Sequence, residues 1–230
     1  MVKGTAYGVG VGTGDPELMT LKAVRLIREN DVIAVPGKAA EESVAYKIAV
    51  RNVPEIADKI LLAVNMPMTK DKNILSTEHK KGAELIEKYL DMGKNVVYLT
   101  LGDPTVYCSF SYLQKLLKSD GYKVELVSGV TSFCAAAARI GVPLVEKDEE
   151  LHVFPNVPNK ADFDNITGSC VIMKSGRYMT DIKSTLEYSD CNVFAVENCG
   201  MSSEKVYNSL DEIPDKTGYF SIVIAKEGSK

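Results

Sequence analysis

The sequence predicts an α/β protein made of two α/β domains, and two observations support this prediction. In the first half of the chain, short apolar runs rich in β-branched residues alternate with segments of helical spacing. Such a β-α-β-α succession is typical of a mostly parallel sheet. Beyond about residue 128, strand candidates follow one another with few helices between them, which indicates a mixed sheet. We therefore expect an N-terminal domain over residues 1–127 and a C-terminal domain over residues 128–230.

The composition narrows the function classes. With 45% hydrophobic and 25% charged residues, the 230-residue chain has the profile of a globular protein. A net charge of -4 and the lack of a basic block argue against a nucleic-acid partner. No apolar run approaches the roughly 18 residues that span a bilayer, and the N-terminus does not resemble a signal peptide. We therefore expect a cytoplasmic protein without a membrane partner.

The cysteines and histidines argue against disulfide bonds and against a metal site built from protein ligands. Five cysteines form no C-x-x-C pair, which is typical of reduced thiols in a cytosolic protein. Because only two histidines accompany them, a metal site built from protein ligands is not expected. We therefore expect any reaction to depend on an organic cofactor.

The chain is organised around the stretch from residue 95 to residue 107. An apolar run from Val96 to Leu101 has the length and β-branched character of a strand buried on both faces. It ends at Gly102-Asp103-Pro104, and helical spacing resumes over residues 110–119. Strand, turn and helix in this order place the turn at the carboxyl edge of a parallel sheet, where open α/β sheets bind ligands. A sharp turn without a ligand is the alternative.

A glycine-rich loop follows the first expected strand, which begins near residue 6, and leads into an expected helix over residues 16–30. A dinucleotide fingerprint needs glycines at relative positions one, three and six. Counted from Gly8 the sixth residue is Thr13, and counted from Gly10 it is Asp15. NAD binding is therefore disfavoured, and no G-K-[ST] segment indicates a nucleotide-binding P-loop. We interpret the glycine density as room for a flat ligand close to the backbone.

A third glycine-containing turn, residues 128–133, precedes an alanine-rich helix expected over residues 134–140. Free N–H groups at the helix start, together with the hydroxyls of Thr131 and Ser132, suit a carboxylate or a ribose. A simple hydroxyl cap is the alternative. The remaining expected helices are 41–51, 77–91, 178–188 and 205–210, and the remaining expected strands are 32–36, 59–64, 123–127, 151–154, 170–173, 192–196 and 219–224.

Together these turns resemble the motifs of the tetrapyrrole methylase family. The resemblance rests on the Gly-x-Gly-x-Gly-Asp-Pro loop at 10–16, the Leu-Gly-Asp-Pro turn at 101–104 and the Gly-x-Thr-Ser turn at 129–132, and it spans nearly the whole chain. Within the family, these motifs and the Glu-Asn-Cys-Gly-Met segment at 197–201 are most similar to the C20-methyltransferases of cobalamin biosynthesis.

The resemblance implies a two-domain fold with a ligand cleft between the domains. It also implies S-adenosyl-L-methionine (SAM) as the cofactor, S-adenosyl-L-homocysteine as its product, a tetrapyrrole substrate and a homodimer. The chain has 5 arginines and 22 lysines, a bias common in AT-rich anaerobes. This composition favours the oxygen-independent route, in which the substrate is cobalt-factor II, over metal-free precorrin-2. Diphthine synthase, which shares the fold and cofactor, and a non-enzymatic nucleotide-binding module are the alternatives. Thr13 and Ser128 depart from the pattern, because the family more usually has proline there.

The resemblance further implies which residues contact the two ligands. The cofactor positions are Gly102, Asp103, Val106, Thr131, Ser132, Met173, Asn198, Tyr219 and Phe220. The positions expected to face the tetrapyrrole are Gly12, Gly14, Asp15 and Pro36. Tyr107 is a further candidate, whose hydroxyl could bind the substrate. For Tyr107, packing against the protein is the alternative to a hydrogen bond with the substrate.

Two residues are assigned roles on chemical grounds. SAM carries an activated methyl group, so we expect direct in-line transfer to an electron-rich ring carbon, which then loses its proton. Asp15 is the candidate base as the nearest titratable group in its loop, and capping of the helix at Glu17 is the alternative. Arg177 follows the strand at 170–173, so it is expected at the carboxyl edge of the sheet, where a guanidinium can bind a substrate carboxylate in two-point fashion. An exposed arginine that opens a helix is the alternative.

Overall fold

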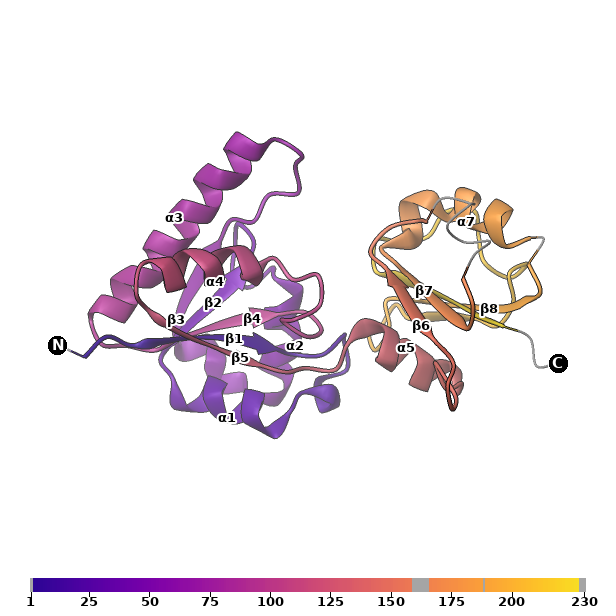
Figure 1. Cartoon of the computed structure of the whole chain (residues 1–230). Helices are drawn as coiled ribbons and strands as arrows, with labels where there is room; N and C mark the ends of the chain where they lie inside the picture. The colour runs from indigo at the N-terminus through magenta and orange to yellow at the C-terminus, as the bar shows by residue number, and fades with distance from the viewer. Residues whose placement is uncertain (1, 159–165, 188, 228–230) are drawn as a thin grey trace. The chain divides into compact units, whose positions relative to one another are not determined.

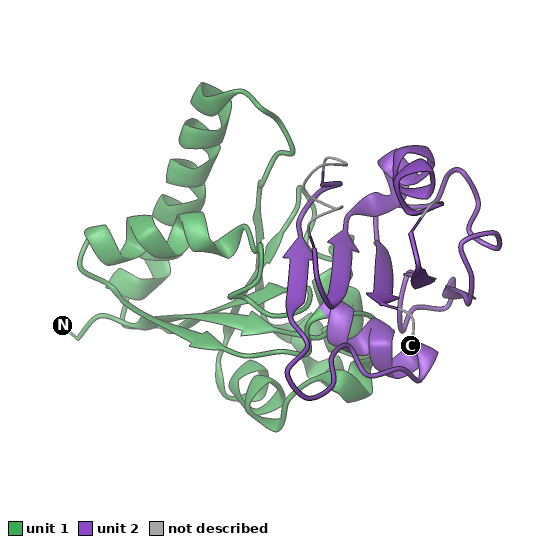
Figure 2. Ribbon diagram, turned by 45° about the vertical axis from the view of Figure 1, so that its right-hand side comes forward, with its two compact units in different colours: residues 1–131 green, residues 132–230 purple. Residues whose placement is uncertain are grey.

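The computed structural model of this chain describes residues 2–158, 166–187 and 189–227 (Figure 1). The chain divides into two units, Met1–Thr131 and Ser132–Lys230, coloured separately in Figure 2. The boundary therefore falls after Thr131, whereas the sequence places it after residue 127. The difference has a local cause, because the turn that follows residue 127 is hydrogen-bonded to the first unit through the backbone N–H of Gly129.

The first unit contains a sheet of five parallel strands in the order β3-β2-β4-β1-β5. Its strands are β1 (Thr5–Gly10), β2 (Val32–Pro36), β3 (Ile60–Val64), β4 (Val96–Thr100) and β5 (Lys123–Val127). All five residues of β4 are buried, as expected for a strand covered on both faces. Because every strand runs the same way, all carboxyl ends meet at one edge of the sheet.

Helices cover both faces of this sheet (Figure 1). They are α1 (Leu21–Glu29), α2 (Val44–Asn52), α3 (Lys72–Asp91) and α4 (Phe110–Ser119), with short 3-10 helices at Pro16–Leu18 and Pro54–Asp58. Alternate residues of β4 point to opposite faces, so Val97 packs in one apolar cluster with α1 and α2, and Tyr98 packs in another with α3 and α4. The two clusters form the core that holds the sheet's carboxyl edge in place.

The prediction of a single helix over residues 16–30 is wrong. A 3-10 turn ends at Leu18, and α1 starts again at Leu21 after Thr20, whose Oγ1 accepts the N–H of Ala23 at 3.2 Å. The restart changes the helical phase, so Leu21 is 90% exposed although the spacing predicts it on the apolar face. The buried face of α1 is formed by Ala23, Leu26 and Ile27.

The start of the helix expected over 77–91 also needs correction. Helix α3 begins at Lys72, because the carboxylate of Asp71 accepts the N–H groups of Asn73 and Ile74 at 2.8 and 3.2 Å. Thr77, where the expected helix starts, therefore lies inside the helix. The segment between Asp71 and Thr77 is polar on most of its surface, so hydrophobic spacing gave no signal there, whereas the aspartate cap did.

The second unit has a mixed five-stranded sheet in the order β6-β7-β10-β8-β9, which confirms the predicted change of character. Strands β6 and β7 are parallel and the other neighbours are antiparallel. The elements are α5 (Ser132–Ile140), β6 (Leu151–Phe154), β7 (Ser169–Met173), a 3-10 helix (Ser175–Tyr178), α7 (Met179–Leu186), β8 (Cys191–Glu197), β9 (Lys205–Tyr207) and β10 (Ser221–Glu227). Helix α7 packs its buried residues against β7, β8 and β10.

Two expectations for the second unit are wrong, and a third is partly testable. The helix expected over 205–210 is the edge strand β9, because cross-strand pairing of Val206 with Val196 outweighs the local helical preference. The strand expected to start at Tyr219 starts two residues later, so Tyr219 and Phe220 lie in the preceding loop. Helix α7 ends at Leu186, and the expected end at Tyr188 lies outside the described residues.

Among the residues described, no helix combines the length and the apolar character that crossing a bilayer would require.

Candidate functional site

The turn after β4 is bonded to the loop after β1. Gly102 has a φ of 70°, a left-handed conformation that favours glycine. Its N–H donates to the carbonyl oxygen of Gly12 at 2.6 Å, which forms an isolated bridge between the two segments. Since β1 and β4 are neighbouring central strands, this bond lies at the carboxyl edge of the sheet, where the sequence predicts ligand binding.

The carboxylate of Asp103 joins the turns after β4 and β5. Oδ1 accepts the N–H and hydroxyl of Thr105 at 2.7 and 2.5 Å, and Oδ2 accepts the N–H of Gly129 at 3.0 Å. Strands β4 and β5 flank β1, so this contact passes across the end of β1. Asp103 is 7% exposed, and its burial raises the pKa of the carboxyl, but the donors from Thr105, Gly129 and Ser128 outweigh burial and hold the pKa below its ordinary value.

Three glycines bring the turns after β1, β4 and β5 into backbone contact. A Cβ on Gly10 would overlap the carbonyl oxygen of Gly102 and lie 2.8 Å from the nitrogen of Gly129. A Cβ on Gly129 would overlap the same carbonyl and lie 2.9 Å from Cα of Gly10. The expectation that these glycines admit a flat ligand is therefore replaced, for Gly10 and Gly129, by close packing of backbone on backbone.

Gly102 differs from the other two glycines. A Cβ built on it would meet nothing closer than the carbonyl oxygen of Val130 at 3.9 Å. Glycine is needed at this position for its positive φ, and the side-chain direction is open. Of the three glycines, Gly102 alone leaves space beside the backbone into which a ligand could fit.

The loops of the first unit carry the other predicted substrate residues. Gly12, Gly14, Asp15, Pro36 and Tyr107 follow or end β1, β2 and β4, so the fold brings them to the same sheet edge. Oδ1 of Asp15 accepts the N–H of Glu17 at 2.9 Å, which is the helix-capping alternative, and the role of base stays a prediction. Tyr107 has a φ of 47° and is 51% exposed. Val106, Thr131 and Ser132 are half-buried.

The second unit brings its predicted residues together at one sheet edge, where β7 and β8 end and β10 begins. Met173 pairs with Ile222, and the N–H of Asn198 donates to the carbonyl oxygen of Phe220 at 2.9 Å. The pKa of Tyr219 is raised by burial, and the nearby charge of Arg177 partly opposes the shift. Arg177 itself lies in the 3-10 helix after β7, as the sequence position predicts.

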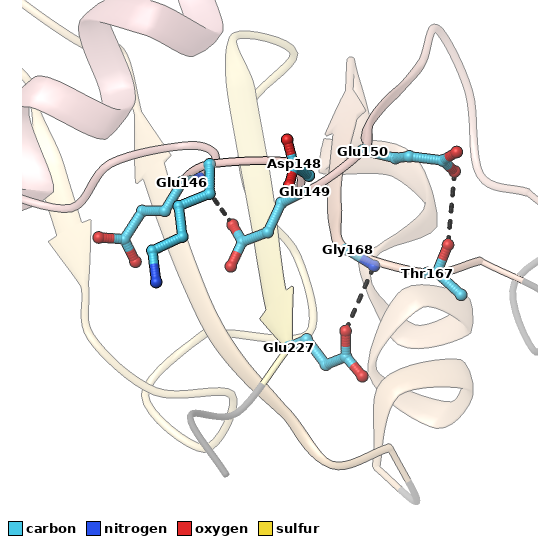
Figure 3. Close-up of a pocket in the computed structure, with 8 residues that line it drawn as sticks. Glu146, Asp148, Glu149, Glu150, Thr167, Gly168 and Glu227 are labelled. Atoms are coloured by element: carbon cyan, nitrogen blue, oxygen red, sulfur yellow. Dashed lines mark hydrogen bonds between the residues drawn. The ribbon is translucent and has the colours of Figure 1, made fainter.

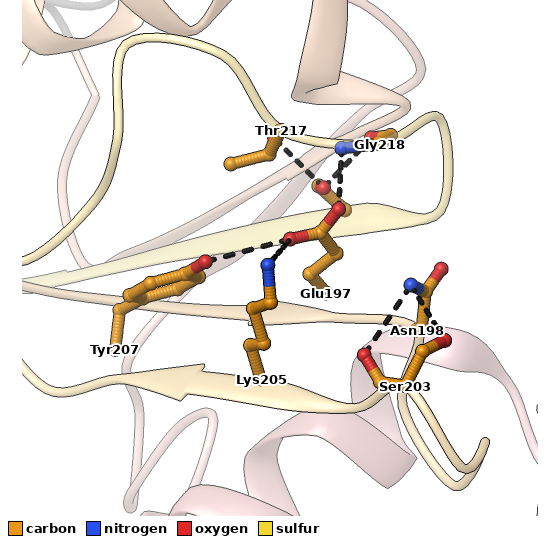
Figure 4. A network of polar contacts seen from close by, with 8 residues as sticks. Glu197, Asn198, Ser203, Lys205, Tyr207, Thr217 and Gly218 are labelled. Carbon is orange, nitrogen blue, oxygen red and sulfur yellow. Dashed lines mark hydrogen bonds and ion pairs between the residues drawn. The ribbon is translucent and has the colours of Figure 1, made fainter.

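Asn198 lies in a turn where its side chain contacts Ser203 (Figure 4), and the turn requires unusual backbone conformations. Its φ is 54°, and Gly200, two residues on, has a φ of 77°. The side-chain amide of Asn198 donates to Oγ of Ser203 at 3.1 Å, and the backbone carbonyl oxygen of Asn198 accepts the N–H of Met201 at 2.9 Å. Asparagine tolerates left-handed backbone better than most residues, so its side chain and its backbone both suit this position.

Glu197 is an anchor of this edge that sequence reasoning missed. Its Oε1 accepts the N–H of Gly218 at 2.6 Å, and its Oε2 lies 3.4 Å from the hydroxyl of Tyr207 and 4.0 Å from Nζ of Lys205 (Figure 4). Burial and the charge of Glu197 raise the pKa of Tyr207. Through its bond to the N–H of Gly218, Glu197 holds the loop that carries Tyr219. An acidic residue at the end of an apolar strand, directly before Asn198, is the signal that could have revealed it.

Comparison with models of known protein families shows to which family the chain belongs. The family described as Tetrapyrrole (Corrin/Porphyrin) Methylases matches residues 5–214, most of both units. This chain belongs to the tetrapyrrole methylase family. The resemblance seen in the glycine turns is thereby confirmed.

Two relatives in this family are similar to the chain over almost their whole length. The chain is 36% identical over 225 residues to a probable cobalt-precorrin-2 C(20)-methyltransferase from Methanocaldococcus jannaschii, covering 96% of this chain and 95% of that one. It is 30% identical over 233 residues to a precorrin-2 C(20)-methyltransferase from a Sinorhizobium species, covering 96% and 94%. The predicted branch of the family agrees with both names.

A solved structure supports the fold. Uroporphyrin-III C-methyltransferase from Thermus thermophilus, solved as a complex with S-adenosyl homocysteine, aligns with a TM-score of 0.72 at 23% identity. The alignment covers 97% of this chain and 98% of that one. The tetrapyrrole methylase fold therefore extends over both units of the chain.

A pocket in the second unit lies away from the predicted residues (Figure 3). It is lined by Glu146, Lys147, Asp148, Glu149, Glu150, Thr167, Gly168 and Glu227. These residues flank the starts of β6 and β7 and the end of β10, which is the sheet edge opposite the Asn198 turn. Its acidic lining would repel a polycarboxylate substrate, and no group of three or more metal-binding side chains occurs among the described residues.

Proposed function

We propose that this tetrapyrrole methylase transfers the methyl group of SAM to C20 of a cobalt-containing tetrapyrrole, cobalt-factor II or cobalt-precorrin-2, in anaerobic cobalamin biosynthesis. The observation that carries the proposal is the 36% identity, over almost the full length of both chains, to the Methanocaldococcus protein. The lower 30% identity to the Sinorhizobium protein makes metal-free precorrin-2 the second substrate to test.

The residues at the first unit's sheet edge fit an adenosyl ligand. Such a site needs backbone hydrogen-bonding groups, open space and a few polar side chains. The turns supply the backbone groups, and the side-chain direction of Gly102 is open. The buried hydroxyls of Thr13 and Thr131 have no hydrogen-bond partner within the described part of the chain, and such groups call for a ligand or an ordered water. We propose that the cofactor residues include Gly102, Asp103, Val106, Thr131, Ser132, Met173, Asn198, Tyr219 and Phe220.

Bound SAM supplies an activated methyl group on a sulfonium sulfur. The protein's role is to place the ring carbon in line with the methyl carbon and to exclude water, so that a carbon–carbon bond forms as the carbon–sulfur bond breaks. The proton lost from the ring carbon passes to a base, for which Asp15 is proposed. Gly12, Gly14, Pro36 and Tyr107, on the same edge, are proposed to face the macrocycle.

A comparison of acceptors tests this function. The purified protein is incubated with methyl-labelled SAM and, in separate reactions, cobalt-factor II, metal-free precorrin-2 or elongation factor. We expect label in the tetrapyrroles, with the higher kcat/KM for the cobalt-containing one. Label in elongation factor alone would indicate a diphthine synthase, and SAM binding without transfer to any acceptor would indicate a non-enzymatic module.

Arg177 is proposed to bind a substrate carboxylate, because it stands at the sheet edge beside Tyr219. Replacing Arg177 with alanine should raise KM for the tetrapyrrole about tenfold, leave SAM affinity unchanged and make substrate binding less sensitive to salt. Arg25, which pairs with Glu29 on the exposed face of α1 at 2.8 Å, provides the control. If the Arg177 and Arg25 variants had the same KM for the tetrapyrrole, Arg177 would have no part in substrate binding.

The homodimer implied by the family resemblance is also a proposal for this chain. Dimerisation would add buried surface to two units of modest size. Light scattering should give about twice the 25.1 kDa mass of the chain at micromolar concentration. The monomer mass across that range would contradict it.

A further inference from the structure

The Asn198 turn, residues 198–204, is closed by backbone bonds and by side-chain bonds, among them the bond from the Asn198 amide to Oγ of Ser203 at 3.1 Å. Two of its first three residues have positive φ, which costs backbone energy at the asparagine. Inside the turn, the N–H of Met201 donates to the carbonyl oxygen of Asn198 at 2.9 Å, and the N–H of Glu204 donates to that of Met201 at 3.0 Å. The backbone N–H of Gly200 points instead to a side chain.

That side chain is the carboxylate of Glu204, which is only 16% exposed. Its Oε2 accepts the N–H of Gly200 at 2.7 Å, and its Oε1 accepts a hydrogen bond from Nε of Arg139. Burial raises the pKa of Glu204, but the Gly200 N–H and the Arg139 guanidinium outweigh it, so the pKa lies below its ordinary value. The carboxylate is therefore charged, and each of its oxygens accepts a hydrogen bond.

Arg139 connects the turn to a helix. It lies on α5, which packs against β8 and β10, the strands beside the Asn198 turn. The guanidinium binds Glu204, so this arginine is already engaged by a protein carboxylate and is not set up to grip a substrate carboxylate. The ion pair thus ties the Asn198 turn to α5.

We propose that Glu204 and Arg139 are positioning residues that hold the Asn198 turn in its cofactor-binding conformation. The inference rests on the proposed function, in which Asn198 contacts SAM. Glu204 acts directly, through the Gly200 N–H, and Arg139 acts through Glu204. Arg139 is 58% exposed, and an ion pair with a solvent-exposed partner contributes little to overall stability, so the loss of the Arg139 guanidinium should appear in ligand affinity rather than in unfolding.

The second unit contains a matched control for this arrangement. Glu149 also uses one oxygen for a backbone N–H, that of Glu146 at 2.8 Å, and also pairs with a cation, Lys226 at 3.1 Å. It lies at the opposite edge of the same sheet, in the lining of the acidic pocket. Removing Glu149 costs the same kinds of bond without touching the Asn198 turn.

The experiment compares SAM affinity by calorimetric titration in the full chain and its variants. Replacing Glu204 with alanine should weaken SAM binding on the order of tenfold, the effect of losing a hydrogen bond to a charged group. Arg139→Met should weaken it about threefold, and Arg139→Lys, which can still pair with Glu204, should restore most of the affinity. Glu149→Ala should bind SAM like the wild type, and KM for the tetrapyrrole should be unchanged in all variants.

Arg139→Met keeps the test decisive if Glu204→Ala fails to fold, because Arg139 is exposed on its helix. Wild-type affinity in Arg139→Met and Glu204→Ala would overturn the inference while leaving the proposed function intact. An equal loss of affinity in Glu149→Ala would also overturn it, since the effect would then be general destabilisation. A wild-type protein that bound no SAM would overturn the proposed function and this inference together.

Discussion

Replacing Gly129 with alanine is expected to abolish measurable SAM binding in a protein that still folds at lower temperature. The new Cβ would overlap the carbonyl oxygen of Gly102 and lie 2.9 Å from Cα of Gly10. Both neighbours are backbone, so neither can rotate away, and the turns must separate. Gly129 does not have a positive φ, so the backbone itself accepts alanine and the effect is purely steric. We expect a loss of about 1–3 kcal/mol in the free energy of unfolding.

Gly4 supplies the control for this prediction. A Cβ on Gly4 would collide with the backbone of Lys94, and this contact lies just before β1, at the opposite edge of the same sheet. Gly4→Ala should therefore lower stability by a similar amount and leave SAM affinity unchanged in calorimetry at a temperature where both variants are folded. If Gly129→Ala bound SAM as tightly as Gly4→Ala, the packed glycine turns would have no part in the site.

Replacing Asp103 with asparagine should weaken SAM binding more than tenfold and lower the free energy of unfolding by about 1–3 kcal/mol. One carboxylate oxygen becomes an NH₂ group, so a donor then faces either the N–H of Gly129 or the groups of Thr105. The turns after β4 and β5 would lose the contact that sets their separation. Titration calorimetry and chemical denaturation measure the two effects.

The pKa of Asp103 adds a pH signature to this prediction. A carboxyl whose pKa is lowered by folding contributes stability above its unfolded pKa of about 3.9 and loses it as pH falls through the folded value. The difference in stability between wild type and Asp103→Asn should therefore be full at pH 7 and shrink below about pH 4.

The control for Asp103 is Asp71, whose carboxylate also accepts two backbone N–H groups in the same unit, at the start of α3. Asp71→Asn should leave SAM affinity unchanged, because this cap joins no two turns of the sheet edge. Unchanged SAM affinity in Asp103→Asn would remove this carboxylate from the site, whatever the variant's stability.

Buried strands and their turns could be predicted from sequence because their signals are local. The apolar run before Gly102 became β4, and helix α4 and strand β5 have the predicted bounds, since each carries its own periodicity and ends at a turn residue. The failures lie where the deciding contact is distant in sequence. Lys205–Tyr207 forms a strand only because β8 offers a partner, which no local pattern reports.

The same distinction applies to the candidate site. The order of strand, turn and helix is visible in the sequence and placed Asp103 on a loop at a sheet edge, whereas Asn198 was marked by the family resemblance alone. That Asp103 reaches across the end of β1 to Gly129 depends on strand order in space, and so does the contact of Gly10 with Gly129. Glu204 was missed for the same reason, because its partner Arg139 lies on a separate helix.

The position of the transferred methyl group tests the central claim most directly. The protein is incubated with cobalt-factor II and SAM carrying a carbon-13 methyl group, and the product is examined by carbon-13 NMR. We predict one labelled methyl group, bonded to C20 of the macrocycle, with S-adenosyl-L-homocysteine released in equal amount. A labelled methyl group at any other ring position, or on the protein, would contradict the assignment of this chain as a C20-methyltransferase.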